Sequence, residues 1–99
     1  MSKPINYVPD QSLPREVIVP PTTVDNKNSR EFIRAWFDGD KVDVAVQAKA
    51  IPRPEAIGMI LADIVKHVCV AHGHAFPANA GDDAEKIMEV LLTELGAIE

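Results

Sequence analysis

The stretch that decides the fold is residues 30–48, which read REFIRAWFDGDKVDVAVQA. Asp38-Gly39 divides it into two runs rich in aromatic and β-branched residues, a pattern that predicts a β-hairpin. A two-residue type I′ turn needs positive φ at both central positions, which glycine tolerates freely and aspartate better than most residues. This turn predicts that Phe37 lies opposite Asp40.

Counting outward from the turn gives the expected hairpin two unlike faces. The apolar face would pair Ala35 with Val42, Ile33 with Val44 and Glu31 with Val46. The other face would pair Arg34 with Asp43 and Trp36 with Lys41, giving an ion pair and a cation–π contact. A three-residue loop, Asp38 to Asp40, would shift the pairing by one residue and lose these complementary charges. The first register is therefore favoured.

Two helices are expected after the hairpin. Proline is favoured at the first position of a helix, because the N–H that it lacks would be unpaired there anyway, so Pro54 predicts the start of the first helix. Gly73 predicts the end of this helix. The apolar stripe of this first helix is Ile57, Ile60, Leu61, Ile64, Val68 and Ala71. A capping box of Asp82 and Glu85 predicts a second helix that ends at Gly96, after a loop over residues 78–81. Its apolar stripe is Ala84, Ile87, Met88, Leu91 and Leu95.

The fold class that follows is α+β, with an antiparallel hairpin or small sheet packed against two α-helices. The valine face should lie under the aliphatic helical stripe, because neither surface is stable in water. Residues 30–99 are expected to form one domain, and the proline-containing residues 1–29 an extended or mobile arm. Within this arm, residues 16–19 are either a third, edge strand or merely extended before Pro20-Pro21.

Composition narrows the classes of function. The chain has 99 residues, a net charge of -5 and one cysteine, which fits a cytoplasmic protein without a disulfide framework. Residues 55–99 carry two Lys or Arg against eight Asp or Glu, and no basic cluster that would bind nucleic acid is present. The apolar stretch 56–71 contains Asp63 and Lys66, so a membrane span is not expected.

Four potential metal ligands fall close together at His67, Cys69, His72 and His74. On a helix His67 and Cys69 would point about 200° apart, so no metal site is expected, and Cys69 is interpreted as a buried, inert thiol. His72 would stabilise the helix C-terminus through the helix dipole. The glycines match no phosphate-binding motif, so no cofactor is expected.

Asp63 and His67 are four residues apart, the spacing at which a carboxylate can orient an imidazole for general-base work. This spacing is also common in plain helical ion pairs. One hypothesis is therefore a small enzyme or a ligand- or metal-binding protein that uses Asp63, His67 and His72. No nucleophile is placed beside this pair, so no catalytic residue is assigned.

The favoured hypothesis is a non-enzymatic interaction module that associates with itself. Phe32, Arg34 and Trp36 share the hairpin face opposite the valines, and these residue types are frequent interface anchors. Either the N-terminal arm or a partner should cover them. Met59 and Val70 lie on the otherwise polar side of the first helix and indicate a second contact surface. A homodimer is expected, and another protein partner is left open.

The run Arg30-Glu31-Phe32-Ile33-Arg34-Ala35-Trp36-Phe37, followed by the helix from Pro54 to Gly73, resembles a family of uncharacterised bacterial proteins, a domain of unknown function. The resemblance covers most of the chain after residue 14. It implies a bacterial cytoplasmic origin and no particular activity or catalytic residue.

Overall fold

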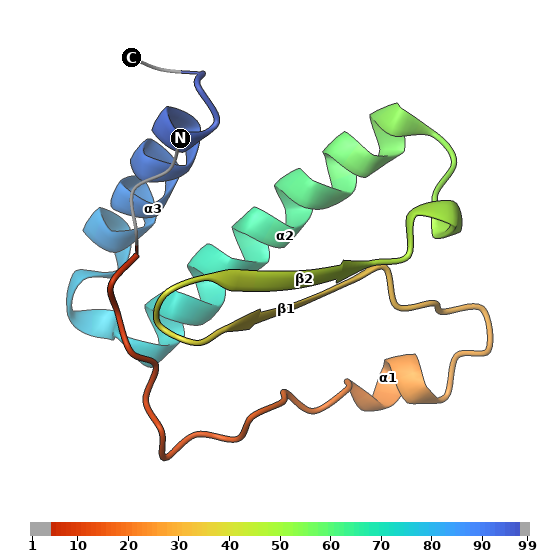
Figure 1. Cartoon of the computed structure of the whole chain (residues 1–99), viewed down its shortest axis with the longest axis horizontal. Helices are drawn as coiled ribbons and strands as arrows, with labels where there is room; N and C mark the ends of the chain where they lie inside the picture. The colour runs from red at the N-terminus through yellow and green to blue at the C-terminus, as the bar shows by residue number, and fades with distance from the viewer. Residues whose placement is uncertain (1–4, 98–99) are drawn as a thin grey trace. The chain divides into compact units, whose positions relative to one another are not determined.

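The computed structural model describes residues 5–97, and its elements follow an α+β order (Figure 1). They are α1 (Pro21–Val24), β1 (Ile33–Phe37), β2 (Val42–Val46), the 3-10 turn η1 (Ala48–Ala50), α2 (Pro54–Ala75), the 3-10 turn η2 (Pro77–Asn79) and α3 (Ala80–Glu94). The chain divides into two compact units, residues 1–52 with the hairpin and residues 53–99 with the two long helices. Each unit is described by itself.

The hairpin forms where the sequence predicts it, but its register differs by two residues. Phe37 lies opposite Val42 rather than Asp40, and Trp36 lies opposite Asp43 rather than Lys41. Because a shift of two residues keeps every side chain on its own face, the expected apolar and aromatic faces both survive. The predicted cross-strand pairs of Arg34 with Asp43 and of Trp36 with Lys41 are wrong.

The hairpin turn explains the difference in register. The loop spans four residues, and the Asp38 carboxylate accepts hydrogen bonds from the backbone N–H groups of Asp40 (2.9 Å) and Lys41 (3.1 Å). Only Gly39 in this loop has positive φ, at 107°, so the expected type I′ turn is wrong. Hydrogen bonds to an aspartate carboxylate from the following backbone N–H groups stabilise a longer loop, which is an alternative to the two-residue turn.

The N-terminal arm is tied to the hairpin at two places. The Tyr7 N–H donates to the Gly39 carbonyl oxygen (3.0 Å), and Glu16 lies 3.5 Å from the Arg34 guanidinium. Residues 16–19 pair with no strand, so the sheet has two strands and this segment is extended. After Pro20, the arm forms the single helical turn α1.

The first long helix, α2, begins at Pro54 as expected but continues through Gly73 to Ala75. The expected stop at Gly73 is wrong because this glycine has a packing role inside the helix. A Cβ atom at Gly73 would lie 3.2 Å from the Cβ of Ala80, so glycine permits the close approach of α3. Phe76 ends the helix, directly before Pro77, which cannot continue it.

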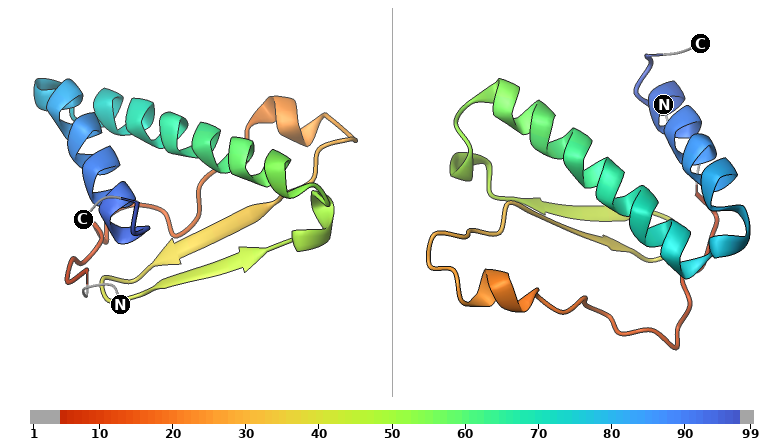
Figure 2. Two further views of the ribbon diagram at one scale, coloured as in Figure 1. Left: turned by 90° about the horizontal axis from the view of Figure 1, so that it is seen from above. Right: turned by 180° about the vertical axis from the view of Figure 1, so that it is seen from behind.

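The second long helix, α3, begins at Ala80, before the expected capping box, and its first residue follows η2 without a side-chain cap. Its end at Gly96 is confirmed. Gly96 has φ 78°, its N–H donates to the Thr93 carbonyl, and the Ala97 N–H donates to the Leu92 carbonyl (2.9 Å), as in a Schellman motif. The two helices form a V whose closed end is at η2 (Figure 2).

The 22 residues of α2 make it long and apolar enough to cross a membrane by length and composition alone. The apolar stretch 56–71 forms only part of this helix, so its own length does not argue against a span. The argument from polarity rests on Asp63 and Lys66, which lie near the middle of the helix. Charged side chains at the centre of a bilayer are costly, so these two residues count against a span.

Apolar side chains remain accessible throughout residues 5–97, where no hydrophobic residue is fully buried. On the valine face, Val42, Val44 and Val46 are 48%, 51% and 53% exposed. Because the hairpin and the helices belong to separately described units, their expected packing against each other stays a prediction.

Candidate functional site

Arg34 and Trp36 lie on one side of the hairpin, and we call these two residues, with the neighbouring Phe32, the aromatic–arginine face. Alternation along β1 places Arg34 and Trp36 on the side opposite Ile33 and Phe37, and Phe32 lies just before the strand. The Arg34 guanidinium carbon lies 5.7 Å from the centre of the Trp36 ring, within the range of a cation–π contact. The expected cation–π partner of Trp36 was Lys41, so the ring has a cationic neighbour from its own strand instead.

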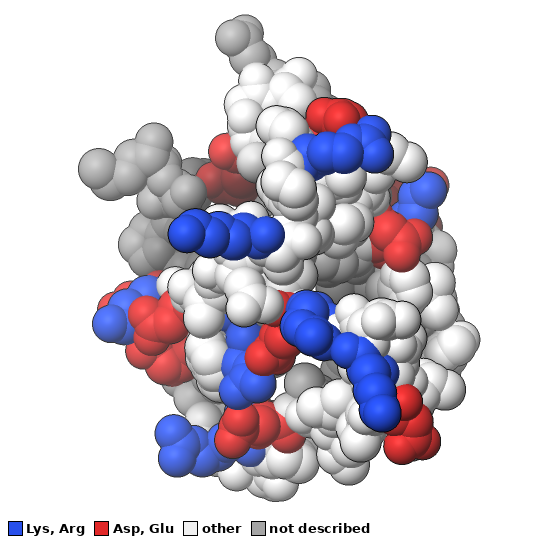
Figure 3. All heavy atoms as spheres, turned by 90° about the vertical axis from the view of Figure 1, so that its right-hand side faces the viewer, with Lys and Arg blue, Asp and Glu red and all other residues white. Residues whose placement is uncertain are grey.

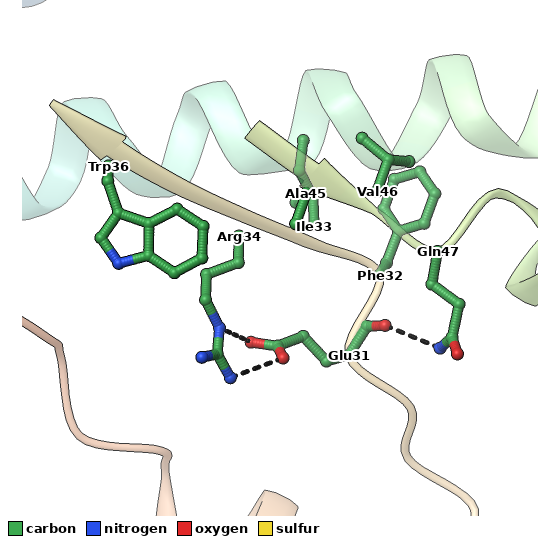
Figure 4. Close-up of a pocket in the computed structure, with 8 residues that line it drawn as sticks. All are labelled: Glu31, Phe32, Ile33, Arg34, Trp36, Ala45, Val46 and Gln47. Atoms are coloured by element: carbon green, nitrogen blue, oxygen red, sulfur yellow. Dashed lines mark hydrogen bonds and ion pairs between the residues drawn. The ribbon is translucent and has the colours of Figure 1, made fainter. Parts of the chain in front are cut away.

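Arg34 is held by a fork of two hydrogen bonds to Glu31, shown as dashed lines in Figure 4. Its Nε and Nη2 atoms donate to the two carboxylate oxygens of Glu31 at 2.9 and 2.7 Å. The hydrogen bonds from Arg34 hold the pKa of the Glu31 carboxyl below its ordinary value. This fork fixes the guanidinium beside Trp36 and lowers the entropy that a partner would have to remove.

The aromatic–arginine face borders a shallow, open hollow of about 600 Å³. Its lining comes entirely from the hairpin and its flanks: Glu31, Phe32, Ile33, Arg34, Trp36, Ala45, Val46 and Gln47. Figure 4 shows the Phe32 ring beside Val46, while Trp36 and Arg34 lie together farther along β1. Such a mixture of aromatic, aliphatic and arginine groups suits a protein surface better than a small polar substrate.

The arm lies near this face and leaves it accessible. Glu16 reaches Arg34, yet Trp36 keeps 39% of its surface exposed. The arm therefore does not bury the Trp36 ring.

The other two expected contact residues lie on α2. Met59 and Val70 are 74% and 58% exposed. They are eleven residues apart in α2, which is about three helical turns, so they lie on the same side of the helix. Val70 also borders a second shallow hollow of about 430 Å³, whose other lining residues are Asp63, Lys66, His67, Ala71 and His74. All six lie on α2, so this hollow is a helix surface rather than an enclosed cleft.

Asp63 and His67 form the expected pair. The His67 Nδ1 atom lies 3.3 Å from the Asp63 carboxylate and 2.8 Å from the Asp63 carbonyl oxygen. Their side chains are 68% and 77% exposed. Water therefore reaches both groups, and the low-dielectric environment that makes such a pair an effective base is lacking at this position.

His72 does not join Asp63 and His67. Five residues of helix turn it about 140° away from His67, and its Nδ1 atom faces the Asp83 carboxylate of α3 at 3.8 Å. Its ring also stacks on Phe76, with 4.8 Å between the ring centres. Sequence reasoning missed this contact, because it depends on how α3 packs on α2 and no spacing along one helix reveals it.

Within residues 5–97, no three His, Cys, Asp or Glu side chains are gathered where they could hold a metal ion. Cys69 is half-buried rather than fully buried. The half-buried residues Val65, Cys69 and His72 follow helical spacing on one side of α2.

Charged side chains of both signs are interspersed on the face drawn in Figure 3. Some charged side chains of the chain pair locally, as Arg53 does with Glu55 at 2.7 Å and Lys86 with Glu89 at 3.6 Å. These pairs are exposed and contribute little to stability.

Comparison with known proteins gives a family and a fold. A family described as "Domain of unknown function (DUF5076)" matches residues 16–97. No curated protein matches the chain. One similar solved structure is described as that of "a putative pyruvate dehydrogenase from the photosynthetic bacterium Rhodopseudomonas palustrus". It shares 24% sequence identity over 86% of each chain, with a TM-score of 0.62, so the likeness concerns the fold.

Proposed function

The chain belongs to the DUF5076 family of unknown function, and we propose that it is a non-enzymatic interaction module that associates with itself as a homodimer. The observation that carries this proposal is the accessibility of both hairpin faces. Trp36 and the three strand β2 valines each expose more than a third of their surface. A two-stranded hairpin is marginally stable alone, so both faces gain free energy when they are covered.

The aromatic–arginine face supports a protein partner over a nucleic acid. Arg34 is neutralised by Glu31, and the chain as a whole carries a net charge of -5. Phosphate binding would need several unpaired cations on one surface. Tryptophan beside an immobilised arginine is instead typical of the centre of a protein interface. Met59 and Val70 provide a second surface in the same proposal.

We place the protein in the bacterial cytoplasm. A single, half-buried cysteine suits a reducing compartment, and the similar solved structure comes from a bacterium. Asp63 and Lys66 argue against a membrane-spanning role for α2, as described above.

Sedimentation equilibrium over a concentration series tests the proposal. We expect a reversible monomer–dimer equilibrium, weakened by Trp36→Ala and largely kept by Trp36→Phe, which retains an aromatic ring. Truncation of a central aromatic anchor typically costs about 2 kcal/mol or more, which is roughly thirty-fold in the dissociation constant. A protein that stays monomeric at every concentration would refute self-association.

The alternative is a ligand-binding or catalytic role for Asp63, His67 and His72. The Asp63–His67 pair beside the second hollow favours it, whereas the contact of His72 with Asp83 opposes it. Titration with Zn²⁺, followed by the imidazole NMR signals, distinguishes the two. Joint saturation of His67 and His72 at one equivalent of metal would favour the alternative.

A further inference from the structure

We propose that the outer edge of β2 pairs antiparallel with the β2 edge of a second copy, giving a continuous four-stranded sheet across the dimer. This inference rests on the proposed self-association and adds a contact at the edge of the sheet to the contacts proposed for its faces. It requires only β2 (Val42–Val46) and the residues that flank it.

The hydrogen-bond alternation of the hairpin shows which backbone groups are available. The Gln47 N–H donates to the Phe32 carbonyl, and the Asp38 N–H donates to the Lys41 carbonyl. In an antiparallel pair, bonded and non-bonded residue pairs alternate, so Val42, Val44 and Val46 belong to the non-bonded pairs. Their N–H and C=O groups point outward, away from β1.

Outside the strand pairing, these groups form no backbone hydrogen bond with any part of residues 5–97. An exposed strand edge with unpaired donors and acceptors is a template for another strand. The three residues are also all valine, which favours extended pairing.

The edge of β2 is complementary to itself. A two-fold axis at Val44 places Val44 opposite the second copy's Val44, and Val42 opposite the second copy's Val46. Every outward-pointing residue then meets another outward-pointing residue, which allows about six hydrogen bonds between the copies. A register one residue away would set outward groups against inward groups, and a register two residues away would leave one outward-pointing valine of each copy outside the paired strands. The register centred on Val44 therefore pairs the most outward groups of β2.

Charges at the two ends of β2 favour the same arrangement. The loop before β2 carries two carboxylates, Asp38 and Asp40, against one ammonium group, Lys41, and Lys49 follows shortly after the strand. Antiparallel pairing brings Lys49 of one copy beside the acidic loop of the other, twice in the dimer. The hydrogen bonds from Lys41 and Asp40 hold the pKa of Asp38 below its ordinary value, so this loop is anionic at neutral pH.

One like-charge approach opposes the pairing. The Asp43 side chains of the two copies lie diagonally across the central axis, each opposite the other copy's Ala45. Diagonal neighbours are about 7–8 Å apart on an exposed sheet face, where water screens their repulsion. The dimer has one such repulsive approach and two attractive approaches of Lys49 to the carboxylates of the other copy's loop.

The edge of β1 is less suited to this role. In Figures 1 and 2 the arm and α1 lie on the β1 side of the hairpin, and Glu16 of the arm contacts Arg34. Pairing of two β1 edges about Ala35 would also bring Glu31 toward the acidic loop of the other copy. The β2 edge has neither obstacle in the hairpin unit.

The test places the same substitution on each edge. Val44→Pro removes one outward N–H of β2, and Ala35→Pro removes the outward N–H of the residue directly opposite on β1. Both positions are outside the hydrogen bonds of the hairpin, where proline is tolerated. By sedimentation equilibrium we expect Val44→Pro to weaken dimerisation at least about ten-fold, and Ala35→Pro to leave it unchanged.

A cross-link reports on the same contact without relying on proline. In a full-length Cys69→Ala background, Val44→Cys should form a disulfide between copies under mild oxidation, because facing Cα atoms in a bonded pair are about 5.5 Å apart. Ala35→Cys should not. A Val44→Pro protein that dimerises like the wild type and a Val44→Cys protein that stays uncross-linked would overturn the edge contact while leaving self-association intact. A monomeric wild type would overturn both.

Discussion

Replacing Gly39 with valine should destabilise the hairpin unit by roughly 2–3 kcal/mol. Gly39 has φ 107°, which residues with a Cβ rarely adopt and β-branched residues resist most. A Cβ at this position would also lie 2.9 Å from the Tyr7 carbonyl oxygen and 3.2 Å from the Val8 Cα. Both are backbone atoms, so no side-chain rotation relieves the contact.

The magnitude has two parts. Forcing positive φ on a residue with a side chain costs about 1–2 kcal/mol. Moving the arm away breaks the hydrogen bond from the Tyr7 N–H to the Gly39 carbonyl, whose net contribution is about 0.5–1.5 kcal/mol. For a domain of this size, the sum corresponds to a decrease in melting temperature on the order of 10 °C.

Urea unfolding followed by fluorescence measures the effect, because Trp36 is the single tryptophan and lies on β1. Gly39→Val in a chain shortened by residues 1–8 should retain only the φ cost, since Tyr7 and Val8 are gone. Protein concentration is kept fixed so that association contributes equally. An unchanged unfolding midpoint in the full chain would refute both the position of the turn and its contact with the arm.

Two further predictions concern the helices and the turn. Gly58→Ala in α2 should stabilise the protein by about 0.5–1 kcal/mol, because alanine favours a helix and the added methyl group enters open space. Gly73→Ala should stabilise the protein less, or destabilise it, because the added methyl group would lie 3.2 Å from the Cβ of Ala80. Thermal unfolding monitored by circular dichroism compares them, and equal gains would contradict the close helix approach. The pKa of Asp38 is lower in the folded protein than its ordinary value of 3.8. Ionised Asp38 therefore contributes stability above pH 3.8, and this contribution is lost as the pH falls through the lower pKa of the folded state. Asp38→Asn should therefore lose less stability than the wild type as the pH falls below 3.8, and parallel pH curves would show that Asp38 does not hold the turn.

Local pattern predicted the hairpin, its two faces, the start of α2 and the end of α3. These features depend on residues near in sequence: period-two alternation, proline at a first helical position and glycine at a helix end. The fold class and the resemblance to a domain of unknown function are confirmed by the elements and by the family match.

The features that sequence reasoning got wrong depend on competition or on distant contacts. The observed hairpin register differs from the predicted one because the Asp38 carboxylate caps a four-residue loop, an alternative to the two-residue turn. Gly73 does not end α2 because Ala80, seven residues later, occupies the space beside it. His72 contacts Asp83 for the same reason, since only the packing of α3 brings them together.

The candidate contact residues were chosen by residue type and expected face alone, and their role in an interface stays a prediction. Alternation predicted that Phe32, Arg34 and Trp36 share a face; Arg34 and Trp36 do lie together, whereas the Phe32 ring lies beside Val46 (Figure 4). The ion pair of Arg34 with Glu31 was not predicted. The expected partner of Arg34 was Asp43 on the other strand, whereas Glu31 lies three residues earlier in the same part of the chain.

The unequal lengths of α2 and α3 bear on where this protein can be cut. Helix α2 is seven residues longer than α3, which corresponds to about 10 Å at 1.5 Å per residue. Since α3 runs back from η2, the first two turns of α2, with Ile57 and Ile60, extend past its reach. Short helical ends without a packing partner fray in water. Amide protons in these turns should therefore exchange before those in the rest of α2, and the same turns are the part of the helix most open to cleavage by a protease.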